Sequence, residues 1–251
     1  MTELVQIQHQ ERKHALCSAS KSNIWLNCPA ALTTWLQAPP RPSNKYAIEG
    51  TKAHELAEKL LKARLKEETY EMQNDDMFLN VQKYVLYVLH KYNEFDEPPQ
   101  VKIEASLILD KELDMYGLAD IAMTGYKKGI QCGIIIDLKY GKTPVSAEEN
   151  SQLAYYAVAL MTTSKKALES VEVCIHQPRI KNPVTSVVYS SLELIEWKKT
   201  LTDAANKSYL QHIGLQEKKW VKGDHCKWCE GKVLCPEWET GVREYDENEF
   251  C

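Results

Sequence analysis

The sequence lacks any hydrophobic run that approaches the roughly 18 residues needed to span a bilayer. Its polar first residues, 1–14, lack the apolar stretch of a secretory signal peptide. Internal repeats, low-complexity tracts and long linkers are also missing, and no segment matches the helicase-type phosphate-binding pattern GxxxxGK[ST]. These absences predict a cytoplasmic protein that does not contact a membrane, organised as one domain over residues 1–251.

An excess of positive charge is missing as well. The chain carries 31 Lys and Arg residues against 35 Asp and Glu residues, a formal net charge of −4. This balance argues against binding nucleic acid through bulk electrostatic attraction. It is compatible with an enzyme that has a local basic groove around an acidic metal centre, because bound divalent cations offset negative charge there.

Hydrophobic periodicity divides the chain into three parts. A helical lead-in, residues 18–100, contains expected helices at 18–37, 48–66 and 77–94. A core at 101–211 contains expected strands at 101–109, 116–124, 132–138, 171–177 and 185–190, with helices at 147–161 and 192–211. A cysteine-bearing appendage covers 212–240. The pattern predicts an α/β fold with a central mixed sheet flanked by helices.

Two carboxylates lie in strand-like runs of this core. Asp120 follows Gly117, and Asp137 ends the most hydrophobic run of the chain. A buried carboxylate is costly unless it is paired or holds a cation, and oxygen ligands suit Mg²⁺ or Mn²⁺. Strand alternation places Lys139 on the same face as Asp137, where a lysine can stabilise charge on a phosphate oxygen. A lone Asp-x-Lys pair is more often a surface salt bridge, so the interpretation needs further support.

That support comes from four short motifs in order. The chain reads GTKAHE at 50–55, GLAD at 117–120 and IIIDLK at 134–139, and Gln152 and Tyr156 share one face of the next helix. The ordered set resembles the RecB-type branch of the PD-(D/E)xK nucleases, from about residue 18 to residue 235. The resemblance implies a restriction-endonuclease-like core.

The resemblance also implies a role for each matching residue. His54, Asp120 and Asp137 would bind the metal, and the Leu138 carbonyl would add a backbone ligand. Asp120, Asp137 and Lys139 would be the catalytic residues. For His54 the alternative is an ordinary histidine on a helix surface or at the edge of the core.

The resemblance covers two residues of the next helix as well. Gln152 and Tyr156 resemble the motif that contacts DNA and orients the lysine, and the alternative is that they are ordinary polar residues on an amphipathic helix. Glu104, on the preceding strand, is an auxiliary candidate for the metal site or for positioning water. An exposed strand glutamate is the commoner case.

Eight cysteines are many for a chain without an export signal, and their uneven placement argues against a disulfide framework. Cys226, Cys229 and Cys235 form a CxxC-x5-C run, which is typical of metal ligands in a reducing compartment. Cys28 is the expected fourth ligand, and Cys17, eleven residues earlier, is the alternative.

One early and three late cysteines resemble the iron–sulfur exonucleases of the AddB type and of CRISPR adaptation. The resemblance implies a 4Fe–4S cluster that joins the C-terminal segment to the N-terminal helices. Structural Zn²⁺ is the alternative, and His225 could then replace one ligand. The remaining cysteines read as free thiols, buried at Cys132 and Cys174 and on a tail at Cys251.

The leading hypothesis is a metal-dependent DNA exonuclease that acts on linear DNA from its ends in recombination, repair or phage DNA processing. The resemblance implies a phage or mobile-element origin and a single-strand annealing or recombination protein as partner. Homo-oligomers occur among related exonucleases. Two alternatives remain open: a non-catalytic DNA-binding or assembly module that keeps the fold, and a structure-specific endonuclease.

Overall fold

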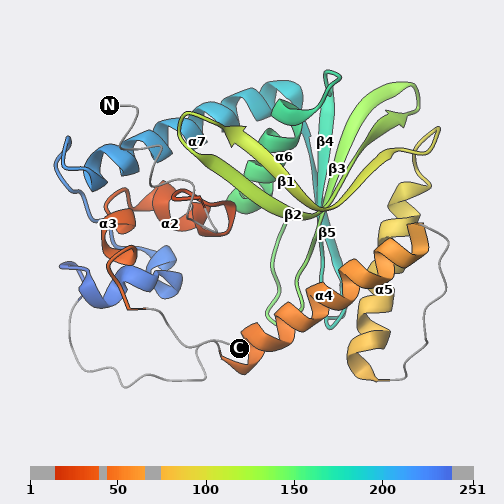
Figure 1. Cartoon of the computed structure of the whole chain (residues 1–251), viewed down its shortest axis with the longest axis horizontal. Coiled ribbons are helices and arrows are strands. Elements are labelled where there is room, and N and C mark those ends of the chain that lie inside the picture. Colours follow the sequence, from red (N-terminus) through yellow and green to blue (C-terminus); the bar gives the residue numbers. More distant parts are fainter. Residues whose placement is uncertain (1–14, 40–43, 66–74, 239–251) are drawn as a thin grey trace.

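The computed structural model in Figure 1 describes residues 15–39, 44–65 and 75–238. The expectations for residues 1–14 and for Cys251 fall outside the described residues. None of the helices that the structure describes combines the length and the apolar character that crossing a membrane requires.

A five-stranded mixed sheet forms the centre of the molecule. Its strands lie side by side in chain order: β1 (Gln100–Asp110), β2 (Met115–Lys127), β3 (Ile130–Leu138), β4 (Ser170–His176) and β5 (Val184–Ser190). All neighbours are antiparallel except β3 and β4, which are parallel and joined through helix α6 (Ser151–Thr163). A parallel pair needs such a crossover. The predicted α/β class with a central mixed sheet is confirmed.

Helices cover both faces of the sheet (Figure 1). Helices α4 (Lys45–Leu65) and α5 (Asp76–Tyr92) pack on one face, and α6 with α7 (Ser191–His212) on the other. Along β3, Ile134 and Ile136 join the hydrophobic core beside α4 and α5, whereas Ile135 joins the core beside α6. Because the middle of β3 is buried on both faces, residues 132–136 form an apolar run instead of an alternating pattern.

The single helix expected at 18–37 is wrong. The structure divides this segment into η1 (Ala19–Lys21), α2 (Ser22–Asn27) and α3 (Ala31–Trp35). The break lies at Cys28, whose backbone is extended with φ −133° and ψ 92°. Pro29 causes it, since proline disfavours the helical conformation of the residue before it and has no N–H to donate.

Side-chain caps set the start of two later helices. Helix α6 begins at Ser151, four residues after the expected start at 147, because the Asn150 side chain accepts hydrogen bonds from two backbone N–H groups of the first turn. A capping box between Ser190 and Glu193 starts α7. After α7, the short helices η2 (Asp224–Trp228) and η3 (Glu230–Leu234) fold back beside α2 and α3 (Figure 1).

Candidate functional site

Three carboxylates lie in a row across β1, β2 and β3. In the antiparallel register of β1 and β2, Ile103 pairs with Ile121 and Ala105 with Ala119, which puts Glu104 level with Asp120. At the last β2–β3 pair, Ile121 with Ile136, Asp120 directly precedes Ile121 and Asp137 directly follows Ile136. The carboxylates therefore meet where the strands begin to separate, and like charges so placed favour a cation between them.

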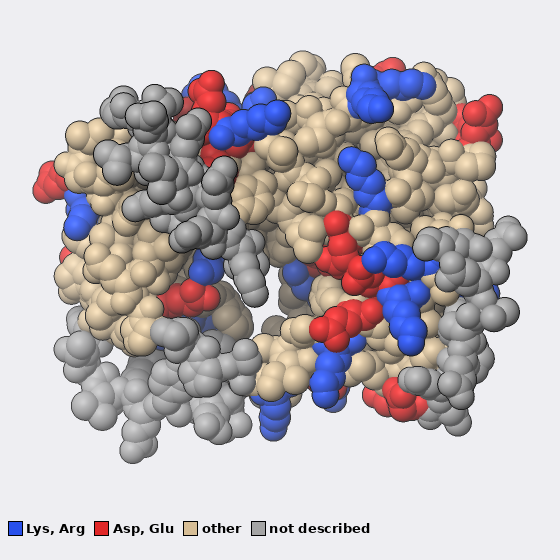
Figure 2. Space-filling model, viewed as in Figure 1, with Lys and Arg blue, Asp and Glu red and all other residues tan. Residues whose placement is uncertain are grey.

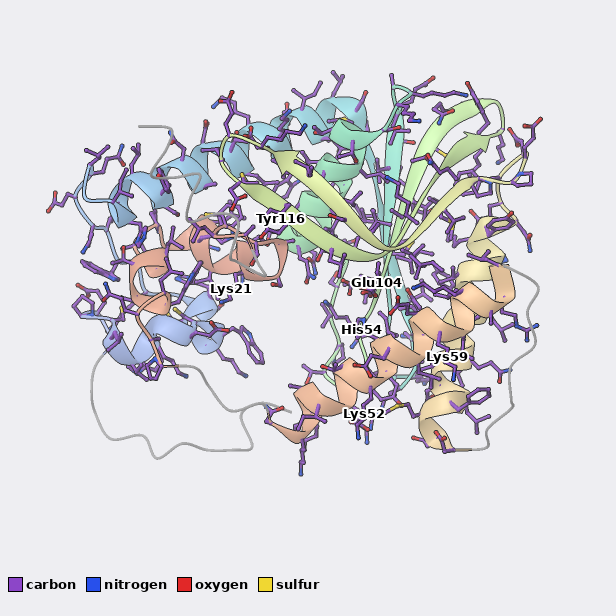
Figure 3. All side chains as sticks on the ribbon, viewed as in Figure 1. Lys21, Lys52, His54, Lys59, Glu104 and Tyr116 are labelled. Atoms are coloured by element: carbon purple, nitrogen blue, oxygen red, sulfur yellow. The ribbon has the colours of Figure 1, made fainter. Side chains whose placement is uncertain are left out.

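A histidine from the helix above the sheet completes the first group. The His54 Nδ1 atom lies 3.1 Å from the Asp120 Oδ1 atom, and Leu138 N donates to Asp120 Oδ2 at 2.7 Å. One ligand atom each from His54, Glu104 and Asp120 lies within 4.8 Å of the other two. Figure 3 shows His54 on α4 and Glu104 on β1 next to each other between helix and sheet. We call these three residues the acidic cluster.

Glu104 has an unusual backbone. Its φ of 48° is in the left-handed region, which non-glycine residues rarely adopt within a strand. Strain of this kind persists where the surrounding structure requires it, often at functional sites. Burial raises the pKa of Glu104 to about 7, and the charges of Asp120 and Glu58 add to the rise. A residue ranked as auxiliary from the sequence therefore belongs to the acidic cluster.

The electrostatics of His54 match this surrounding charge. Burial lowers the pKa of His54, but its hydrogen bond to Asp120 and the Asp120 charge outweigh burial, so the net pKa is raised. The imidazole therefore favours its charged form beside the carboxylates. A divalent cation would replace that proton, since metal ligands must be deprotonated.

Asp137 and Lys139 form a second group on the α6 side of the sheet. The Lys139 Nζ atom lies 2.9 Å from Asp137 Oδ2, and the Asp137 residue is only 4% exposed. Burial raises the pKa of Asp137, Lys139 opposes this, and the Asp120 charge adds to it. Burial lowers the pKa of Lys139, but the charge of Asp137 raises it more, so the ammonium form is favoured.

Helix α6 supplies the third element, at the two positions that the sequence singled out. Gln152 Oε1 accepts a hydrogen bond from Lys139 Nζ at 3.1 Å, and Gln152 Nε2 donates to Asp137 Oδ1 and to the Tyr156 hydroxyl, each at 3.4 Å. Tyr156 is 5% exposed, which suits orientation of Gln152 better than contact with DNA. Gly117 leaves room for Tyr156, because a Cβ atom there would lie 2.8 Å from the tyrosine ring.

The expected ligand set therefore falls into two neighbouring groups. His54 and Asp120 are close together, as expected, while the Asp137 side chain contacts Lys139 and Gln152 and lies outside the acidic cluster. Leu138 approaches Asp120 through its backbone N–H. Pairing the expected strands 101–109 and 116–124 as an antiparallel hairpin would have indicated Glu104 as a ligand candidate, because the register puts Glu104 level with Asp120.

Four cysteines converge at the other end of the molecule. A single cavity beside α3 is lined by cysteines from the break after α2 and from the C-terminal segment: Cys28, Cys226, Cys229 and Cys235. Four thiol donors at one site suit either a structural Zn²⁺ or an iron–sulfur cluster.

The two alternative ligands predicted from the sequence, Cys17 and His225, differ in position and contacts. Cys17 does not line this cavity, and burial raises its pKa to about 12. The His225 Nε2 atom is 2.9 Å from the Val221 carbonyl oxygen. Cys132 and Cys174 are buried free thiols, as predicted.

The cavity wall also offers N–H donors for sulfur. The Val221 backbone N–H donates to the Cys28 sulfur at 3.3 Å. The indole Nε1 of Trp220 is buried without a hydrogen-bond partner among the described residues. Metal–sulfur clusters depend on such donors around their sulfurs.

Comparison with known proteins places the chain in a family. Residues 14–250 match the family described as "Protein of unknown function (DUF2800)", and because this is most of the chain, the chain belongs to it. A structure from Eubacterium rectale described as "Putative exonuclease" has 10% sequence identity and a TM-score of 0.50, and the match covers 97% of this chain and 94% of that one. This likeness concerns the fold.

A more distant likeness links the chain to an alkaline exonuclease from Laribacter hongkongensis. The identity is 11% and the TM-score 0.35, with 77% of this chain and 95% of that one covered. At this TM-score the likeness carries no argument about the site.

Proposed function

We propose that this member of the DUF2800 family is a divalent-metal-dependent nuclease that hydrolyses DNA phosphodiester bonds, acting as an exonuclease from DNA ends. One arrangement carries the proposal: the acidic cluster lies directly beside a lysine that a buried aspartate and a glutamine hold in place. Carboxylates for a metal next to a fixed ammonium are the groups that phosphodiester hydrolysis needs. DNA is proposed as the substrate because the four ordered motifs resemble those of DNA nucleases.

The donor chemistry of the acidic cluster fits Mg²⁺ or Mn²⁺. Its ligands are two carboxylates and one imidazole, and the raised pKa of Glu104 marks a site with excess negative charge. His54, Glu104 and Asp120 would hold the ion, with Asp137 at the neighbouring position. When bound, the ion supplies Lewis-acid polarisation of the phosphodiester.

Lys139, Gln152 and Tyr156 have separate roles in this proposal. The Lys139 ammonium stabilises negative charge that develops on a phosphate oxygen, since it keeps its proton beside Asp137. Gln152 fixes the direction of that ammonium, and Tyr156 supports Gln152 from the next turn of α6. Figure 2 shows acidic and basic side chains gathered over α4 and the adjacent sheet, where Lys59 and Lys52 flank His54 (Figure 3). These lysines would attract the DNA backbone locally.

The test is a cleavage assay on end-labelled linear DNA and on a closed circle, with Mg²⁺ or Mn²⁺. Lys139→Met keeps most of the side-chain length and removes the charge, and we expect cleavage to fall by about 10²–10³-fold. Lys199→Met is the matched control, because the Lys199 side chain is 80% exposed and pairs with Asp203 on the same helix. It should cleave as the wild type does.

The outcome of this assay distinguishes an exonuclease, an endonuclease and a DNA-binding module. Metal-dependent loss of the linear substrate alone supports the exonuclease, whereas cleavage of the circle would identify an endonuclease. DNA binding without cleavage in both wild type and Lys139→Met would overturn the catalytic proposal in favour of a binding module. Thermal unfolding of Lys139→Met checks that the unpaired Asp137 has not unfolded the protein.

The cysteine cavity supports a second proposal, a structural 4Fe–4S cluster held by Cys28, Cys226, Cys229 and Cys235. The convergence of the four thiols on one cavity supports a bound metal centre, and the motif resemblance favours a cluster over a single Zn²⁺. Such a cluster would join the segment after α2 to the C-terminal segment, whose sequence positions differ by about 200 residues. Iron, sulfide and zinc analysis of anaerobically purified protein tests it, and one equivalent of zinc without iron would contradict it.

The nuclease proposal includes a role in recombination, repair or phage DNA processing, with an annealing protein as partner. This role derives from the motif resemblance. Co-purification of the tagged chain with a recombination protein from its native host would test it.

A further inference from the structure

A small cavity lies under the acidic cluster, between α4, α5 and the first three strands. Its volume is about 10 Å³, and residues of the cluster line it. That volume accommodates about one water molecule, provided that two or more polar groups hold it. Two further residues with polar side chains line the cavity: Glu58 of α4 and Tyr84 of α5, neither of which belongs to a motif.

Tyr84 is fully buried, at 0% exposure. Its hydroxyl has no hydrogen-bond partner among the residues that the structure describes. Buried polar atoms without a partner are rare in folded proteins, because they lose their hydrogen bonds to water and gain nothing in return. The surroundings of Tyr84 are a hydrophobic core in which phenylalanine would pack as well.

Tyr84 shares the wall of this cavity with Glu104 and Asp120. Their carboxylate oxygens are hydrogen-bond acceptors. Burial raises the pKa of Tyr84 well above its ordinary value, and the charges of Asp120, Asp137 and Glu104 add to the rise, so the phenol stays neutral and can donate.

We propose that Tyr84 is a positioning residue of the metal centre, whose hydroxyl donates a hydrogen bond to a water molecule in this cavity and through it orients Glu104 and Asp120 for metal binding. The inference rests on the proposed function only in needing the acidic cluster to bind a divalent ion. Partners of metal ligands fix ligand orientation, and their loss typically weakens metal binding about 10–100-fold.

A rival reading assigns Tyr84 to the core alone. Its ring lies 5.7 Å from the His176 ring, and the His176 Nδ1 atom also has no hydrogen-bond partner among the described residues. A small movement that paired the two would make the hydroxyl structural. The two readings predict different responses to the loss of the oxygen atom.

The experiment measures Mn²⁺ affinity of the full chain by electron paramagnetic resonance, together with thermal unfolding in EDTA. We expect Tyr84→Phe to bind Mn²⁺ about 10–100-fold more weakly, while its metal-free stability equals or exceeds that of the wild type. Tyr155→Phe is the matched control, because Tyr155 is also 0% exposed with an unpartnered hydroxyl but packs in the core on the other face of the sheet. Its Mn²⁺ affinity should not change.

The outcomes separate this inference from the proposed function. Wild-type Mn²⁺ affinity in Tyr84→Phe overturns the inference, and so does a loss of metal-free stability without a loss of affinity. If the wild type itself binds no Mn²⁺, or binds as tightly after Asp120→Asn, the metal centre of the proposed function fails first.

Discussion

The Lys139 ammonium donates a hydrogen bond of 3.1 Å to the side-chain oxygen of Gln152, which lies 13 residues later on α6. The same glutamine reaches Asp137 with its amide nitrogen. Helix α6 thus holds both members of the ion pair between buried Asp137 and partly exposed Lys139, and the crossover that connects β3 to β4 also fixes the direction of the lysine. A lysine held in this way loses little freedom when charge develops beside it.

Gln152→Leu should therefore lower kcat and leave KM unchanged. The variant removes the side-chain amide that holds Lys139, and misplacement of such a group by about 1 Å can cost about 100-fold in rate. Steady-state cleavage of labelled DNA measures both constants. Tyr156→Phe removes only the 3.4 Å contact to Gln152 and should have a smaller effect in the same direction. An equal rise in KM for both variants would instead indicate a role in DNA binding.

The contribution of Glu104 to the stability of the metal-free protein should fall as pH rises. The pKa of Glu104 is about 7 in the folded protein against an ordinary value of 4.5, so the folded state binds the proton more tightly than the unfolded chain. The share of the free energy of unfolding that depends on Glu104 should then fall between about pH 4.5 and pH 7 in EDTA. The raised pKa values of His54 and Asp137 act in the same direction, whereas His176, whose pKa burial lowers to about 4, acts in the opposite direction.

Glu104→Gln isolates the first contribution. Denaturant unfolding at several pH values should show the wild type losing stability relative to this variant as pH rises from about 4.5 to 7, and Mn²⁺ should stabilise the wild type more at high pH than at low pH. Glu112→Gln, an exposed position in the turn after β1, is the control and should follow the wild type. A pH profile of Glu104→Gln identical to that of the wild type would contradict the assignment.

Cys28→Ala should abolish cluster binding, whereas Cys17→Ala should retain it. Both thiols are buried, but only Cys28 lines the cavity with the three C-terminal cysteines. The measurement is iron per chain after anaerobic purification. Removal of iron from the wild type should also lower its unfolding temperature, because metal binding contributes to folding. Iron lost equally from both variants would mean a general loss of packing.

Gly231→Ala should loosen the C-terminal segment. A Cβ atom at Gly231 would lie 2.4 Å from the Thr34 hydroxyl and 2.5 Å from the backbone N of Trp35, and backbone cannot move aside cheaply. Overpacking of this kind costs about 1–3 kcal/mol. Thermal unfolding and iron content should both fall. Gly141→Ala, where nothing lies within 4 Å of the added atom, should change neither.

Much of the architecture could be predicted from local patterns. The β-branched runs of the core form five strands because extended backbone suits those side chains and both faces of β3 are buried. The Asp137–Lys139 contact also follows locally, since alternate residues of a strand share a face. The break at Cys28 had a local signal as well, in Pro29, which the helical periodicity around it concealed.

The composition of the acidic cluster depended on contacts that no local pattern encodes. The His54–Asp120 contact joins residues 66 positions apart, so it depends on how α4 lies over the sheet. The register of β1 brings Glu104 opposite Asp120, and the position of α5 brings Tyr84 beneath both. The sequence by itself determined the five strands, the contact between Lys139 and Asp137, and the set of candidate cysteine ligands. Only the tertiary structure decided which carboxylates share one site, because long-range packing, and not periodicity, sets distances between separate elements.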